Sequence, residues 1–308
     1  MARTPGRRLP LLGLCCALLV ACGTSSTTTA PSTPTPSPSS STNPGQSTVD
    51  PKALPLGDGH VSTSAQAGYV WSCQTKFGGG GAAKAGPWIQ GSAWDSTTKI
   101  AVKGTVKWSQ AAYTATITGA NRVLTTKDVP VNQTTGTFPV AASDPAAAYD
   151  RNPNRINSTS STLTIPATPV AAAQPSCVPG GAIGMLIDGV YLFNALDGQG
   201  RDAVAHELLD TCGGHPEMTG QYHHHNIPSC MQALANGSSN LVGYAKDGFG
   251  IFVDRNSSGG LLTNADLDAC HGRTSQISWD SQQVSMYHYV ATLEYPYTVG
   301  CYMGAAVR

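Results

Sequence analysis

The C-terminal half of the chain repeats its own order of motifs, and this repeat constrains the fold more than any other feature. The first copy opens at Asp188-Gly189, continues through "LLDTCGGH" and reaches "YHHH" at Tyr222. The second opens at Asp247-Gly248, continues through "DLDACHG" and reaches "YHYV" at Tyr287. The offset between the copies is 59 residues at the Asp-Gly pairs, 58 at the cysteines and 65 at the Tyr-His pairs. We interpret this ordered match as an internal duplication.

Each copy has the pattern of a small β unit. An Asp-Gly pair between apolar runs predicts a tight β-hairpin, followed here by a short helix or turn that ends at the cysteine and by a strand with the Tyr-His pair. Upstream, "KIAVKGTVKW" and "YTATITG" alternate apolar and polar residues, as strands do. The predicted fold class is therefore mainly β with a few short helices (α+β, antiparallel), stapled by disulfides. Residues 141–175, rich in Ala, Pro, Asn and Ser, predict a long irregular connection or a boundary between subdomains.

The N-terminus has the features of an export signal. Three arginines precede an apolar run over residues 9–21, which is shorter than the roughly 20 residues that a membrane-spanning helix needs. The run ends in "LVACG", which resembles the lipobox of bacterial lipoproteins. We predict a signal peptide at residues 1–21 and lipidation of Cys22; the alternative is ordinary signal cleavage with Cys22 incidental. The expected location is the extracytoplasmic face of the cell envelope, with the membrane as partner through the lipid anchor.

The composition then divides the remaining chain. Residues 22–56 consist largely of Ser, Thr and Pro, which bury too little apolar surface to order a chain, so we predict a disordered tether. Residues 57–308 are the predicted globular domain, with a β-rich part at about 57–150 and the duplicated His-rich part at about 177–308. The formal net charge is zero and 12% of residues are charged, which argues against a nucleic-acid partner.

Six cysteines follow the tether, and an even number in an exported chain predicts three disulfides. A thiolate metal site is the alternative, but the chain has no CxxC pair. Equivalence between the two copies orders the pairing. The predicted disulfides are Cys212–Cys230 and Cys270–Cys301, which leaves Cys73–Cys177.

The histidines are the candidate functional residues. Seven of the eight lie between His206 and His288. Because side chains alternate along a strand, His223 and His225 share one face, and two such imidazoles can reach one ion at about 2.0–2.1 Å. His288 is the counterpart of His223 in the second copy, and a histidine follows the cysteine in each copy, as a ligand or as a loop-stabilising hydrogen-bond partner. The predicted metal ligands are His215, His223, His225, His271 and His288, and imidazole ligands favour zinc or copper over calcium or magnesium.

Other motifs near the histidines have plainer interpretations. "HELLD" at His206 resembles the HExxH zinc helix, but Asp210 replaces the second histidine, and the matching Asp268 occurs in a copy without His-Glu. We therefore interpret both aspartates as turn or capping residues and keep Glu207 as the candidate base of a catalytic alternative. Tyr222 and its counterpart are expected to be packed aromatics. "FGGGGAAKAGP" lacks a phosphate-binding pattern and predicts a plain loop.

The motifs together resemble a known family. The runs "GVYLFNALD", "GRDAVAHELLDTCGGHPEMTGQYHHHN", "LVGYAKDGFGIF", "LTNADLDACHGRTS" and "YHYVATLEYPYTVGCYMG" are similar to the YHYH-domain family of exported proteins, named for a Tyr-His-Tyr-His motif. Upstream, "GPWI", "WDSTTKIAVKG" and "YDRNPNRI" are similar too. His224 stands where the motif has its second tyrosine, and Val290 follows Tyr289 in the second copy. The departure in the first copy leaves both His223 and His225 in place. The resemblance implies an identity but little about function.

Three function classes follow from these residues. The first is an envelope-anchored, His-rich transition-metal-binding lipoprotein for capture, delivery or sensing. The second is a metal-dependent hydrolase or oxidase with an extracytoplasmic substrate, which requires a cleft over the ion and a carboxylate within reach of a bound water. The third is an adhesion or carbohydrate-binding module without metal, with tryptophans as its contact surface. A serine hydrolase of the G-x-S-x-G type is not indicated, because that motif does not occur.

Overall fold

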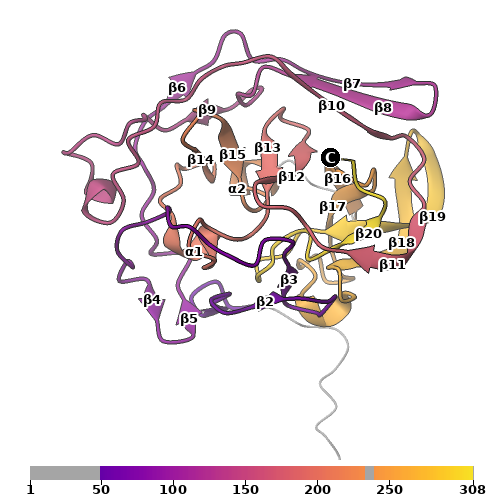
Figure 1. The fold of residues 1–308 in the computed structure, drawn as a ribbon, viewed down its shortest axis with the longest axis horizontal. Coiled ribbons are helices and arrows are strands. Elements are labelled where there is room, and N and C mark those ends of the chain that lie inside the picture. Colours follow the sequence, from indigo (N-terminus) through magenta and orange to yellow (C-terminus); the bar gives the residue numbers. More distant parts are fainter. Residues whose placement is uncertain (1–48, 233–238, 308) are drawn as a thin grey trace, which may run out of the picture. The chain divides into compact units, whose positions relative to one another are not determined.

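Short strands make up most of the regular structure (Figure 1). This computed structural model describes residues 49–232 and 239–307; the predicted signal peptide at residues 1–21, Cys22 and most of the predicted tether lie outside the described residues. Within the described part, the helices are single turns. They are α1 (Ala203–His206), α2 (Ser229–Gln232) and the 3-10 turns η1 (Pro145–Ala148) and η2 (Asn264–Asp266). No helix of the described part is long and apolar enough to cross a membrane. The prediction of a mainly β, largely antiparallel fold is confirmed.

An eight-stranded sheet forms the centre of the fold and contains the Tyr-His segments. Its strand order is β14-β15-β13-β12-β16-β17-β19-β18. The strands are β12 (Ala182–Leu186), β13 (Tyr191–Phe193), β14 (Gly214–Pro216), β15 (Tyr222–His224), β16 (Ser239–Ala245), β17 (Gly250–Asp254), β18 (Gly272–Trp279) and β19 (Gln282–Val290).

The sequence repeat is also a repeat of structure. In each copy, a hairpin is followed by a strand that runs parallel to its second strand and is flanked by one antiparallel neighbour. Leu192 lies opposite His224 in the first copy, and their counterparts Ile251 and Tyr289 lie opposite each other in the second. The copies join where β12 pairs antiparallel with β16. The strand order is therefore symmetric about this seam, and equivalent residues lie in opposite halves of the sheet.

A three-stranded antiparallel sheet covers one face of the central strands. It consists of β7 (Tyr113–Thr118), β8 (Asn121–Thr126) and β10 (Ser161–Pro166). Leu124 and Ile165 from this sheet pack with Met185 and Tyr191 of the central sheet in one hydrophobic cluster. Figure 1 shows these strands along the upper edge of the ribbon.

The remaining strands form small sheets of two or three strands. They are β1 (Leu54–Pro55) with β5 (Ala93–Trp94) and β4 (Ile89–Gln90), β2 (Val61–Ser62) with β3 (Val70–Trp71), β6 (Val106–Lys107) with β9 (Thr134–Thr135), and β11 (Ala171–Ser176) with β20 (Tyr302–Gly304). The structure differs from the sequence predictions in two segments, the end of the tether and the irregular connection. The fold already includes β1, which lies inside the predicted tether, because Leu54 is buried in the core. Residues 141–175 also contain strand β10, since its alternate side chains Leu163 and Ile165 are buried.

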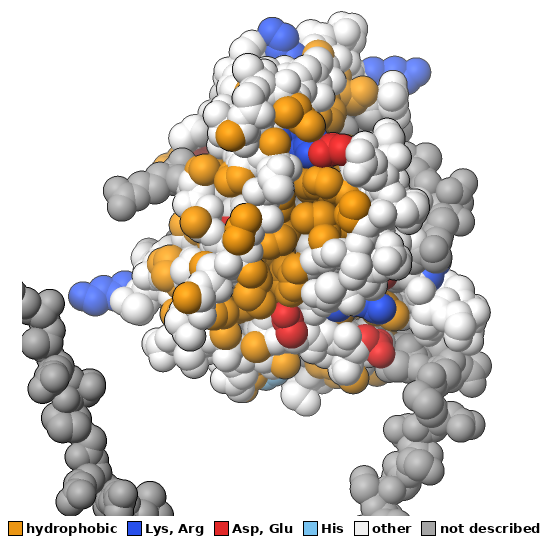
Figure 2. All heavy atoms as spheres, turned by 90° about the vertical axis from the view of Figure 1, so that its right-hand side faces the viewer, with side chains coloured by type: hydrophobic (Ala, Val, Ile, Leu, Met, Phe, Trp, Pro, Cys, Tyr) orange, Lys and Arg blue, Asp and Glu red, His pale blue; other side chains and the backbone are white. Residues whose placement is uncertain are grey.

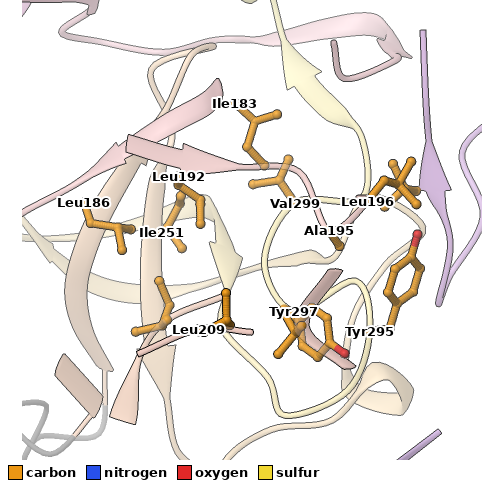
Figure 3. Close-up of a cluster of buried hydrophobic side chains, with 14 of the residues drawn as sticks. Ile183, Leu186, Leu192, Ala195, Leu196, Leu209, Ile251, Tyr295, Tyr297 and Val299 are labelled. Carbon is orange, nitrogen blue, oxygen red and sulfur yellow. The ribbon is translucent and has the colours of Figure 1, made fainter. Parts of the chain in front are cut away.

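The main hydrophobic core lies against the opposite face of the central strands. Figure 3 shows Leu186, Leu192 and Ile251 close together, and the C-terminal segment contributes Tyr297 and Val299 to the same cluster. Burying each of these apolar side chains stabilises the fold by about 1.5–3 kcal/mol. Because the central strands are covered on both faces, apolar residues run continuously along them and do not alternate with polar ones.

Three disulfides connect the cysteines as predicted. The Cα atoms are 5.0 Å apart in Cys73–Cys177, 5.7 Å apart in Cys212–Cys230 and 4.6 Å apart in Cys270–Cys301. The last two occupy equivalent places in the two copies, so each copy has one crosslink behind its Asp-x-Cys turn.

Charged side chains are sparse on the face that Figure 2 presents. Hydrophobic side chains gather in the middle of that face, with a few Lys, Arg, Asp and Glu side chains around them. This distribution agrees with the charged fraction of 12% in the whole sequence.

Candidate metal centre

Three histidine side chains from two neighbouring strands converge at one point. His215 on β14 lies directly opposite His223 on β15, and His225 follows β15 on the same face as His223. The Nε2 atoms of His223 and His225 are 3.1 Å apart, and those of His215 and His225 are 3.4 Å apart. All three residues are buried, and their ligand atoms lie within 4.8 Å of one another. Strand alternation and strand pairing thus produce the cluster.

The nitrogen spacing matches that of ligands around a single ion. Two ligands of a tetrahedral zinc ion, each at about 2.0–2.1 Å, lie about 3.3 Å apart. Buried polar nitrogens that face one another are costly unless each has a hydrogen-bond partner or a shared ion between them. The arrangement is therefore chemically suited to hold one transition-metal ion.

Backbone carbonyls orient two of the rings. His223 Nδ1–H donates to the carbonyl oxygen of Gln221 at 3.1 Å, and His225 Nδ1–H donates to that of Asn194 at 2.5 Å. A proton on Nδ1 leaves the Nε2 lone pair free for a metal, which is how outer hydrogen bonds fix the tautomer of ligand histidines. The ring of Phe193 stacks on that of His223 with centroids 3.9 Å apart.

Glu207 places a carboxylate beside the cluster. Helix α1 ends at His206, and Glu207 continues in an extended conformation. Its Oε2 lies 3.2 Å from His215 Nε2 and 3.1 Å from His225 Nε2. These are ion-pair distances, but the angles do not make a hydrogen bond, and this buried oxygen has no hydrogen-bond partner. Lys99 Nζ donates to the Glu207 carbonyl oxygen at 2.6 Å and so holds the end of the helix in place.

Burial and mutual charge decide the protonation states. Burial lowers the pKa of His223 well below its ordinary value, and the neighbouring His215 and His225 lower it further. Burial would raise the pKa of Glu207, but the charges of His215 and His225 outweigh burial and lower this pKa well below its ordinary value. A neutral imidazole at His223 is the state that a metal ligand requires, and an ionised Glu207 is able to accept a proton.

The cluster opens into a pocket of about 440 Å³. His215, His223, His225 and Glu207 line it together with residues from distant parts of the sequence. The other main contributors are Phe77, Gly80 and Gly81 of the Gly-rich loop, Asp150, Asn152 and Asn154, Phe193 and Asp197, and Glu217 and Met218. The sequence predicted only a plain loop for the glycines and gave no role to Asn152 or Glu217. The segment "YDRNPNRI", singled out for its resemblance alone, was the available signal for Asp150, Asn152 and Asn154.

His288 and His271, two of the predicted ligands, do not join the cluster. His288 is on β19, which four strands separate from β15, and its Nε2 lies 3.0 Å from Asp254 Oδ2. His271 Nε2 lies 3.0 Å from the hydroxyl oxygen of Thr292. The reason is the symmetry of the sheet, which sends equivalent residues to opposite halves. The expectation that both copies supply ligands to one site is not met.

The HExxH-like segment does not form a zinc helix. Because α1 ends at His206, Glu207 and Asp210 lie beyond it, and His206 Nε2 is 2.9 Å from Asp58 Oδ2, away from the cluster. Asp210 accepts hydrogen bonds from the backbone N–H groups of Gly136, Cys212 and Gly214. Its counterpart Asp268 accepts from those of Cys270 and Gly272. Both aspartates are turn residues, as predicted.

The tyrosines of the motif, Tyr222 buried and Tyr287 partly buried, are hydrogen-bond donors. Tyr222 donates its hydroxyl to Asp210 Oδ2 at 2.8 Å, and Tyr287 donates to Asp268 Oδ1 at 3.2 Å. This matches the interpretation of both as packed aromatics.

His224 takes the place of the motif's second tyrosine. Its Nε2 lies 3.3 Å from Asp188 Oδ2, whereas its counterpart Tyr289 donates to Asp247 Oδ2 at 2.6 Å. Asp188 and Asp247 are the aspartates of the two Asp-Gly pairs. The substitution at 224 therefore preserves a strand-to-hairpin contact on the face opposite the metal centre.

One family model matches the chain. The model, described as YHYH protein, covers residues 162–262, which contain the whole first copy, the three clustered histidines, Glu207 and the first hairpin of the second copy. No matching curated protein or solved structure was found. The resemblance seen in the sequence is thus confirmed for residues 162–262, which match the YHYH family model.

Proposed function

We propose that the YHYH domain of this chain binds one transition-metal ion through Nε2 of His215, His223 and His225. The observation that carries the proposal is the convergence of these three buried nitrogens, with spacings of 3.1 and 3.4 Å to His225. All-nitrogen ligands suit zinc or copper. Glu207 adds a negative charge beside the site, which favours a cation there.

The protein that contains this site is, in our proposal, an exported lipoprotein attached to the cell envelope through Cys22. Three disulfides support an oxidising compartment, since such bonds persist outside the cytosol. An ion held here can serve capture, delivery or sensing, and the pocket gives access both to the ion and to a substrate. Trp88 and Trp94 are buried in the core and cannot form a contact surface, which leaves the partly exposed Trp71, Trp108 and Trp279 as the candidates of the adhesion alternative.

Metal analysis of the purified full chain tests the proposal. After incubation with Zn²⁺ or Cu²⁺ and removal of excess metal, mass spectrometry of the elements should find one equivalent per chain. His223→Ala should lose this metal, because two imidazoles remain. His288→Ala is the matched control, since it removes the equivalent buried histidine of the second copy, and it should keep the metal.

Circular dichroism establishes that each variant is folded, and His223→Gln replaces His223→Ala if the latter is not. A wild-type chain that takes up neither ion would overturn the proposal. So would a folded His223 variant that retains a full equivalent.

A further inference from the structure

We propose that the metal centre is catalytic, with Glu207 as general base for a metal-bound water that hydrolyses an ester or amide of an uncharged or cationic substrate. This inference rests on the proposed metal site and assigns it a reaction and a substrate class. Four features of the site lead to it: the number of ligands, the position of Glu207, the pocket and the charge of its lining.

The ligand count favours catalysis over a purely structural role. Structural zinc sites have four protein ligands, whereas catalytic sites have three and keep one position for water or substrate. Among the described residues, the group whose donor atoms lie close enough to share one ion consists of the three histidines alone. Glu207 contacts His215 and His225 but is not part of that group. The fourth position is thus available to a water.

Glu207 is placed as a base rather than as a ligand. Its Oε2 lies 3.1–3.2 Å from two of the ligand nitrogens, is buried, and has no hydrogen-bond partner. An oxygen this close to two ligand nitrogens borders the space around the ion where a bound water would lie, and a general base must be within about 2.6–3.2 Å of the group whose proton it takes. A water at the fourth position would give this oxygen a hydrogen-bond donor in addition to its ion-pair contacts with the two histidines. Lys99 holds the backbone of Glu207 through its carbonyl, which keeps the carboxylate in position.

The reaction balances with water as the only co-reactant. Glu207 takes one proton from the water while the water oxygen forms a bond to the acyl carbon. The bond from that carbon to the leaving oxygen or nitrogen then breaks, and the proton passes from Glu207 to the leaving group. One water is consumed, and a carboxylic acid and an alcohol or amine are released.

The pocket lining sets the substrate class. The lining residues include Asp150, Asp197 and Glu217 but no lysine or arginine. Arg201 neutralises Asp197 at 2.7 Å. Hydrogen bonds from Thr219 and Gln221 hold the carboxylate of Glu217 in place. The three remaining carboxylates, those of Asp150, Glu207 and Glu217, outweigh the two positive charges of a bound divalent ion, so the loaded pocket disfavours phosphate and carboxylate groups and favours uncharged or amine-bearing molecules.

Aromatic and amide side chains complete the lining. Phe77 and Phe193 provide flat apolar surfaces, and Asn152 and Asn154 provide amide groups. The volume of about 440 Å³ accommodates a small molecule or the end of a larger one.

Hydrolysis of three p-nitrophenyl esters by the metal-loaded full chain tests the inference. The probes are the uncharged acetate, the cationic glycine ester and the anionic succinate monoester. We expect metal-dependent turnover of the first two and at least tenfold slower turnover of the third. Glu207→Gln should reduce turnover by about 100-fold or more, the usual contribution of a general base, and should keep one equivalent of metal. Glu207→Asp retracts the carboxylate by one methylene group, so its turnover should lie between those of the wild type and Glu207→Gln.

The outcomes separate this inference from the metal proposal. Metal-loaded wild-type chain that hydrolyses neither the acetate nor the glycine ester would overturn the catalytic inference and leave the metal site intact. Glu207→Gln with metal and full turnover would do the same. Loss of metal in Glu207→Gln would make Glu207 a ligand and overturn its role as base. His288→Ala should retain both metal and turnover.

Discussion

At the scale of single residues, the two copies of the repeat differ most where the first copy has its clustered histidines. The strand register places Arg273 at the position of His215. The matching Tyr-His runs place Val290 at that of His225. His288 matches His223, but its Nε2 faces a carboxylate, Asp254 Oδ2 at 3.0 Å, and not other imidazoles. The ligand set is therefore complete in the first copy only.

His271 contributes to acid sensitivity instead of metal binding. Burial lowers its pKa to about 3, so it stays neutral in the folded protein while the unfolded chain takes up a proton near pH 6.5. Between about pH 6.5 and 3 the unfolded state binds more protons, so stability falls as the pH falls through this window.

We expect His271→Gly to reduce this loss. Glycine is the natural replacement, because the equivalent Gly213 has φ 75° and His271 has φ 69°, a region that glycine tolerates. Urea unfolding at pH 7 and pH 4.5 measures the effect: the wild type should lose about 2 kcal/mol more than the variant between the two conditions. Equal losses would show that His271 is not the titrating group.

At the scale of elements, strand pairing explains both what the sequence predicted and what it missed. Alternation along one strand was enough to put His223 and His225 on a common face. The third member, His215, depends on the register of β14 against β15, which pairs it with His223. Strand pairing also keeps His288 out of the histidine cluster, because β19 lies in the other half of the sheet. Local patterns do not determine which strands become neighbours, so the full ligand set could not be read from the sequence.

Because the two copies have equivalent strand registers, we predict that a second metal site can be built in the second copy. Arg273→His with Val290→His would give the second copy imidazoles at all three positions that hold them in the first. We expect the double variant to bind a second equivalent of zinc, more weakly than the first because His288 is already paired with Asp254. Val290→His alone is the matched control and should bind one equivalent, since two imidazoles hold zinc poorly. A folded double variant that still binds one equivalent would contradict the equivalence.

At the scale of the whole molecule, the repeat, the mainly β class and all three disulfides could be predicted from the sequence. Each follows from ordered motifs or from counting. The pocket could not, because Phe77, Asn152, Phe193 and Glu217 come from separate segments that meet only through tertiary packing. The start of the folded part was also misplaced, since β1 has too few apolar residues to stand out from the tether. Composition locates domains better than it locates their edges.

The central claim is that three imidazoles of one repeat share one metal ion, and anomalous diffraction tests it most directly. Crystals of the full chain loaded with zinc, measured on both sides of the zinc absorption edge, should show a peak about 2.0–2.1 Å from Nε2 of His215, His223 and His225. Bound zinc that lies elsewhere in the molecule, with no anomalous peak between these three rings, would contradict the account.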